Sequence, residues 1–202
     1  MANNSDKSMT DEKRFVESAQ PHSWLLVAVN LHTQAVSLHK TSGKSVTSLL
    51  SNEDELKGQW DATNRSVFLL GGFAIENCLK AFLVYENPSW ISNGKLSKEL
   101  KTHSLTDLSS KVNQLPNPLH GQWVIHSFQN GLESWARYPC GLTAGDLGEE
   151  GVLTDRLWLG YLRLIGAYGS QLQDMLKRPW RGPHGFYGHY EFSGNFFATD
   201  IN

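Results

Sequence analysis

The sequence lacks a strong charge of either sign. Its 202 residues include 18 lysines and arginines against 20 aspartates and glutamates, which gives a formal net charge of -2. A nucleic-acid binder that works through overall positive charge is therefore disfavoured, although a local basic patch remains compatible with this balance. The length suits one domain with a substantial core rather than two unrelated domains.

Cysteine and long apolar runs are also scarce. The two cysteines, Cys78 and Cys140, show no C-x-x-C spacing and no cluster of ligand residues around them. This argues against a structural zinc site or a disulfide framework and favours a reducing compartment. The N-terminus is polar, and no stretch approaches the roughly 18 apolar residues of a membrane span. We predict a cytoplasmic protein without a membrane segment.

The common catalytic and metal-binding motifs are missing as well. His120, His126 and Glu133 do not form H-E-x-x-H, and no G-x-S-x-G is present. A metal site therefore has little support, and we predict no metal and no cofactor.

What the sequence does contain is helical periodicity. Apolar residues recur at steps of three and four over about 24–38, 61–85, 105–112, 119–136 and 153–175. We expect residues 1–9 to be disordered and a short helix to run from Thr10 to before Pro21. We expect no strand outside the C-terminal tail, and residues 45–59 have no clear assignment. The sequence predicts an all-α, up-and-down antiparallel helical bundle of about five helices. It divides into an N-terminal arm (1–20), the bundle (21–177) and an aromatic, glycine-rich tail (178–202).

The longest predicted helix holds one carboxylate and one amine, four residues apart, in "GGFAIENCLKAFLV". If exposed, Glu76 and Lys80 form an intrahelical pair worth roughly 0.2–0.5 kcal/mol. If the helix is buried nearly all round, Glu76 is a partly buried carboxylate that needs a specific partner. Sequence alone favours the exposed pair without deciding. Gly71 and Gly72 in the same helix predict close helix packing.

Five segments in order, "WLLVAVNLHTQAVSLHK", "AIENCLKAFL", "THSLTDL", "ARYP" and "LTDRLWLGYLRLIGAYGSQLQDML", together resemble the HEPN (higher eukaryote and prokaryote nucleotide-binding) family. The second resembles the A-x-E-x-x-L-K element of that family. The resemblance covers residues 21–177 and implies a bundle of four or five helices, commonly a homodimer, that is involved with nucleotides or RNA. Members include RNases of toxin and antiviral systems and noncatalytic partners of nucleotidyltransferases. It also implies that Glu76 and Lys80 serve the fold.

The nuclease motif of that family, Arg-x(4–6)-His, is not where the resemblance would place it. The only such spacing joins Arg178 and His184, beyond the last helix, and Pro179 and Pro183 disfavour a helix there. The sequence therefore predicts a noncatalytic nucleotide- or RNA-associated module, with toxin–antitoxin or defence systems as its setting. Two alternatives stay open: a metal-independent RNase that uses Arg178 and His184, and a purely structural partner-binding protein.

Three residues near predicted helix ends are the candidates for ligand contacts. Ser104 and Asp107 are spaced as the N-cap and N3 of a predicted helix. His103 precedes this helix start, where it suits a phosphate, or it is a surface or capping residue. Arg137 and Tyr138 suit a phosphate and a stacked base, and Arg137 equally suits an anchor for the following loop. The tail interleaves aromatic and basic residues, which is typical of a stacking platform for single-stranded nucleic acid. Packing against the bundle or a second subunit is the favoured interpretation.

Overall fold

The computed structural model describes residues 4–138, 151–194 and 196–197. Helix accounts for 59% of the chain, and the strands are few and short, so the all-α class is confirmed. The elements in chain order are α1 (Asn4–Ala19), α2 (Pro21–His39), β1 (Val46–Leu50), β2 (Leu56–Asp61), α3 (Asn64–Glu86), the 3-10 helices η1 (Pro88–Ile91) and η2 (Lys98–Leu100), α4 (Leu105–Lys111), α5 (Gly121–Glu133), α6 (Asp155–Leu176), β3 (Trp180–Arg181), the 3-10 helix η4 (Pro183–Gly185) and β4 (Tyr187–Gly188).

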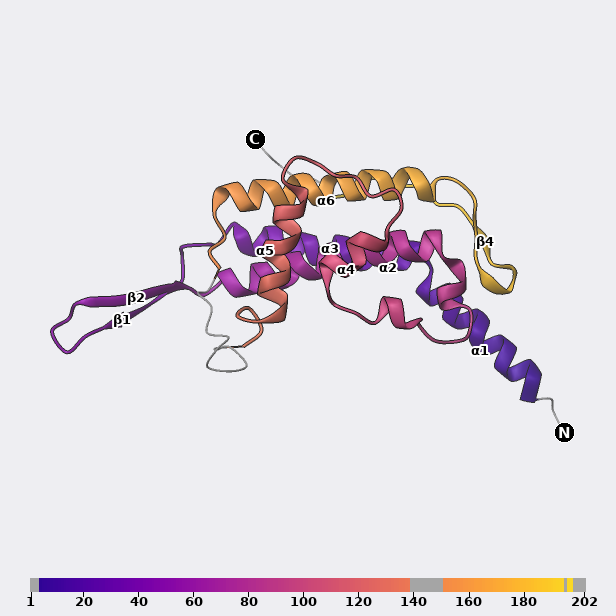
Figure 1. The fold of residues 1–202 in the computed structure, drawn as a ribbon, viewed down its shortest axis with the longest axis horizontal. Helices are drawn as coiled ribbons and strands as arrows, with labels where there is room; N and C mark the ends of the chain where they lie inside the picture. The colour runs from indigo at the N-terminus through magenta and orange to yellow at the C-terminus, as the bar shows by residue number, and fades with distance from the viewer. Residues whose placement is uncertain (1–3, 139–150, 195, 198–202) are drawn as a thin grey trace.

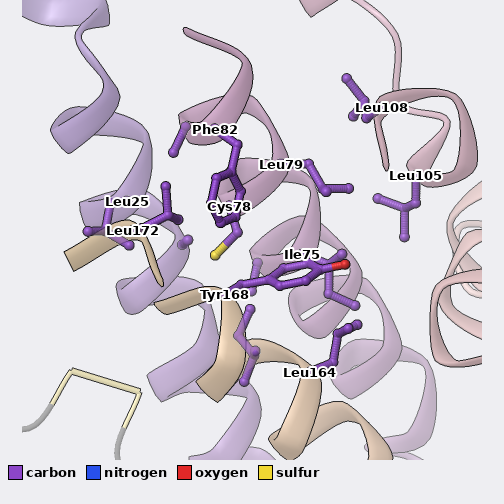
Figure 2. Packing of buried hydrophobic residues seen from close by; sticks show 14 of the residues in the cluster. Leu25, Ile75, Cys78, Leu79, Phe82, Leu105, Leu108, Leu164, Tyr168 and Leu172 are labelled. Carbon is purple, nitrogen blue, oxygen red and sulfur yellow. The ribbon is translucent and has the colours of Figure 1, made fainter. Parts of the chain in front are cut away.

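Helix α3 is the centre of the fold, and α2, α4, α5 and α6 all pack against it. Between residues 71 and 84 only Phe73 and Asn77 are partly exposed, which explains why the sequence is apolar nearly all round this helix. Figure 2 shows Leu79 of α3 pointing toward Leu105 of α4 within the buried cluster. Helix α3 is long and apolar enough to cross a membrane, contrary to the sequence-based expectation, but most of it is buried inside the bundle.

The two glycines of α3 mark close contacts, as the sequence predicts. A Cβ atom built on Gly71 would lie 2.6 Å from Cε1 of Phe128, and one on Gly72 would lie 2.7 Å from Cγ of Leu132. Both neighbours belong to α5, which crosses the long helices steeply (Figure 1). The glycines therefore let α5 approach the backbone of α3.

We predict that Gly71→Ala destabilises the fold by about 1–3 kcal/mol, because the buried ring of Phe128 has no room to retreat. Gly166→Ala is the matched control, since a Cβ there meets nothing within 4 Å and alanine favours a helix by about 1 kcal/mol. Urea denaturation should place the two variants on opposite sides of the wild type. Equal stability of the two would contradict the close contact.

The N-terminal arm and residues 45–59 differ from the expectations. Helix α1 already begins at Asn4, six residues before Thr10, and its Val16 is buried in the core. Strands β1 and β2 form an antiparallel hairpin, so the expectation of no strand outside the tail is wrong. The hairpin has no buried face, and this removes the alternation by which a strand is recognised in a sequence.

The described part of the tail packs back onto the helices. Strands β3 and β4 pair with each other, and Trp180 is buried with its Nε1–H donating to the carbonyl of Tyr85 at 3.2 Å. The ring of Tyr190 stacks on His22 of α2 with centroids 4.3 Å apart. These aromatic residues serve intramolecular packing. Residues 139–150, which include Cys140, lie outside the described residues, as do residues 195 and 198–202 of the tail.

Candidate functional site

The middle of α3 reaches the surface only at Phe73 and Asn77, and Glu76 and Lys80 lie buried beside them; we call these four residues the α3 strip. Their spacing of three and four residues places them on one side of the helix. Phe73 and Asn77 are partly exposed, whereas Glu76 and Lys80 are 4% and 5% exposed. The strip is therefore a surface with a buried ion pair at its edge.

The buried ion pair has a third member, His103. Lys80 Nζ donates to Glu76 Oε1 at 2.7 Å, and His103 Nδ1 lies 3.1 Å from both carboxylate oxygens. Lys80 also faces the ring of Trp24, 5.6 Å from its centroid. The favoured interpretation of Glu76 and Lys80 as an exposed pair is thus wrong, because α2 and the segment before α4 cover them. The imidazole of His103, 57% exposed, forms the outer side of the cluster.

The start of α4 is fixed by a set of polar contacts that also holds His103. Ser104 Oγ accepts from the N–H of Asp107 at 3.2 Å, which confirms the N-cap that the sequence predicts. Gln129 of α5 accepts from both the N–H and the hydroxyl of Thr106, at 2.8 and 2.9 Å. These bonds attach α4 to α5, so His103 is held in place beside α3.

Arg137 lies over the other end of the strip. Its guanidinium carbon is 5.7 Å from the centroid of the Phe73 ring, and the side chain makes no hydrogen bond or ion pair with any described residue. Phe73 and Glu76 are about 4.5 Å apart along the helix axis. The structure therefore brings Arg137 and His103, far apart in sequence, to one strip.

Tyr138 is not part of this arrangement. Its carbonyl oxygen accepts from the guanidinium of Arg65 at 2.6 Å, and the residue is 43% exposed. Its ring makes no contact with the strip among the described residues.

An apolar groove of about 280 Å³ adjoins the strip at Asn77. Its lining comes from α1, α2, α3 and the loop before α4, namely Phe15, Ser18, Ala19, Ser23, Trp24, Val27, Asn77 and Leu96. The same loop carries the exposed lysines 95, 98 and 101. Sequence reasoning did not find this groove, because residues from four separate segments form it.

Arg178 and His184 do not form a shared site with the strip. His184 Nε2–H donates to the carbonyl of Ser92 and lies 3.6 Å from a carboxylate oxygen of Glu12. This histidine therefore connects the tail to η1 and α1. Arg178 is exposed just after α6, and no described contact joins it to His184.

A larger cleft of about 650 Å³ lies at the base of the β1–β2 hairpin. His39, Asp61 and Asp155 contribute its ionisable groups. Burial lowers the pKa of His39 despite the opposing effect of Asp155 and Asp61, so the imidazole is neutral near pH 7. Two carboxylates and a neutral imidazole do not suit a phosphate. Among the described residues, no three His, Cys, Asp or Glu side chains are grouped to hold a metal ion.

The α3 strip is therefore the better candidate for an anionic ligand with an aromatic part. A guanidinium is suited to a phosphate, and an apolar groove that contains a tryptophan is suited to a base. Comparison of the chain with family models, with curated proteins and with solved structures gives no significant match.

Proposed function

We propose that the chain is a noncatalytic, cytoplasmic, HEPN-like binding module that associates with a nucleotide or a short segment of RNA at the α3 strip. The observation that supports this most directly is the guanidinium of Arg137, which lies over Phe73 without a polar partner among the described residues. Its planar group of N–H donors is suited to hold a phosphate through two parallel hydrogen bonds. A nucleotidyltransferase is the protein partner that the family resemblance suggests.

The charges around the strip favour an anion. Lys80 offsets the carboxylate of Glu76, and Lys98 of the loop lies 3.9 Å from the carboxylate of Glu99. The exposed cationic groups nearby that are not paired with a described residue are Arg137, Lys95 and Lys101, beside the imidazole of His103. The groove beside Asn77 accepts a base against Trp24, while Arg137 is available to a phosphate at the far end of the strip. Single-stranded RNA or a free nucleotide supplies both parts.

The RNase alternative has less support because of where His184 lies. A histidine that transfers protons must reach the substrate, whereas His184 bonds to Ser92 and is close to Glu12. RNA cleavage that is lost in His184→Ala but kept in His103→Ala would nevertheless establish the RNase and overturn the noncatalytic proposal.

We predict that Arg137→Gln leaves the melting temperature of the free protein nearly unchanged and weakens ligand binding about tenfold or more. A lost charge-assisted hydrogen bond costs about 1.5–3 kcal/mol, and no described contact of the native fold depends on this guanidinium except the Phe73 ring. The measurement is the rise in melting temperature with a panel of nucleotides and a short single-stranded RNA, since a ligand of the folded state must raise it.

Arg163→Gln serves as the control, because Arg163 is an exposed arginine of α6 away from the strip. Equal losses of affinity in the two variants would indicate nonspecific charge attraction. If no ligand of the panel raises the melting temperature, the structural partner-binding interpretation replaces the proposed function.

A further inference from the structure

The β1–β2 hairpin extends away from the helices as an arm (Figure 1). Every residue of β1 is exposed. The arm nevertheless carries large apolar side chains at 44–59% exposure, namely Val46, Leu49, Leu50, Leu56 and Trp60. A two-stranded hairpin without such packing is only marginally stable in water. We therefore expect a surface outside the described residues to cover the apolar side chains of this long arm.

The two edges of the arm differ in how they are protected. Strand β2 has a register shift at Lys57, and a lysine or a bulge at an edge discourages further pairing. Strand β1, with the sequence VTSLL, has no charge, no proline and no glycine. Its outer edge is thus the one that accepts another strand.

The hydrogen-bond pattern identifies which backbone groups lie on that open edge. The N–H of Ala62 donates to the carbonyl of Ser45, so this pair is hydrogen-bonded within the hairpin. Because bonded and non-bonded pairs alternate, Thr47 and Leu49 also bond inward. The N–H and C=O groups of Val46, Ser48 and Leu50 therefore point outward, away from β2.

We propose that β1 pairs antiparallel with β1 of a second copy of this chain, about a twofold axis at Ser48, to give a four-stranded sheet. Such a contact uses the same strand from both copies and closes as a dimer. Val46 then lies opposite Leu50 of the second copy, which brings Val46, Leu50 and Leu56 of the two arms together on one face, whereas Leu49 and Trp60 lie on the other face.

The charges of the arm match this antiparallel arrangement. Lys40 and Lys44 at its base are exposed and form no ion pair with described residues, and the tip carries Glu53 and Asp54. Pairing about Ser48 places Lys44 opposite Asn52 of the second copy, next to Glu53 of the second copy. The lysines where each arm joins the helices thus lie beside the acidic residues at the tip of the other arm.

The test compares proline on the two outer edges. The N–H of Ser48 faces outward on β1, and that of Gln59, its non-bonded neighbour, faces outward on β2, so proline at either position spares the bonds within the hairpin. By sedimentation equilibrium we expect the wild type to be a dimer, Ser48→Pro to dissociate at least tenfold more readily, and Gln59→Pro to remain dimeric. A monomeric wild type, a dimeric Ser48→Pro, or loss of the dimer in Gln59→Pro alone would overturn the proposal.

A cysteine cross-link tests the twofold axis directly. A bonded antiparallel pair has Cα atoms about 5.5 Å apart, within reach of a disulfide, so Ser48→Cys should link two copies under mild oxidation. Gln59→Cys on the other edge should link far less, and a reversed order would contradict the assignment. The inference does not depend on the proposed nucleotide binding, because Ser48→Pro leaves the α3 strip intact and its ligand-induced rise in melting temperature should persist.

Discussion

Replacing Glu76 by alanine should lower the free energy of unfolding by about 3–5 kcal/mol, in chemical denaturation monitored by circular dichroism. The side chain of Lys80 is 6% exposed and its nearest anion is the carboxylate of Glu76, 2.7 Å away. Removing one member of a buried ion pair leaves the other charge without compensation in a poorly solvated place. The face of Trp24 is the favourable contact that remains.

A double variant separates the loss of the partner from the loss of packing. Glu76→Leu combined with Lys80→Met removes both charges at similar volume, and such replacements are often neutral or stabilising. We expect the double variant to recover most of the stability that Glu76→Ala loses. A cost of less than about 1 kcal/mol for Glu76→Ala would instead identify an ordinary exposed pair.

The spacing of Glu76 and Lys80 is visible in the sequence, but their burial is not. Helix α3 is apolar on several faces, so periodicity does not show which face other elements cover. Trp24 from α2 and His103 from the segment before α4 decide that, and both contacts are tertiary. For the same reason the sequence indicated His103 and Arg137 separately, as residues near helix ends, without placing them on one strip.

The β1–β2 arm was missed for a different physical reason. Sequence patterns detect a strand through the contrast between a buried and an exposed face, and this hairpin has no such contrast. Helices α2, α4, α5 and α6 each bury one side against the core and α3 buries most of its surface, so the positions of these five helices were predicted to within a few residues, whereas α1 begins earlier than expected. The N-cap Ser104 was found because its side-chain bond to Asp107 is local in sequence.

His32 shows how a polar residue can belong to the core. It lies one turn beyond Ala28, on the buried side of α2, and is 2% exposed. Its Nδ1 lies 2.9 Å from the hydroxyl of Tyr161, and its Nε2 is buried without a hydrogen-bond partner among the described residues. The ring of Phe197 covers another side, with centroids 5.4 Å apart. Protonation would add both a charge and an N–H without an acceptor.

We therefore predict that acidification destabilises the protein through His32. Burial lowers the pKa of His32 from 6.5 to about 4, so between these values the unfolded chain binds a proton that the folded chain does not. The contribution of His32 to the free energy of unfolding is constant above pH 6.5. Below pH 6.5 it falls by up to about 1.4 kcal/mol per pH unit, and at pH 4 the total loss is about 3 kcal/mol. Urea denaturation at half-unit steps from pH 7.5 to 4 measures this loss.

The variant His32→Gln isolates this contribution from those of other groups. Burial also lowers the pKa values of His22 and His39, so they add to the wild-type slope with the same sign. Glutamine keeps a hydrogen-bonding group for Tyr161 but does not titrate. We expect the variant to be less stable than the wild type at pH 7.5. Between pH 7.5 and pH 4, however, its free energy of unfolding should fall by about 3 kcal/mol less than that of the wild type. Parallel curves for the two proteins would show that His32 is protonated in the folded state as readily as in the unfolded chain, which its buried, unpaired Nε2 argues against.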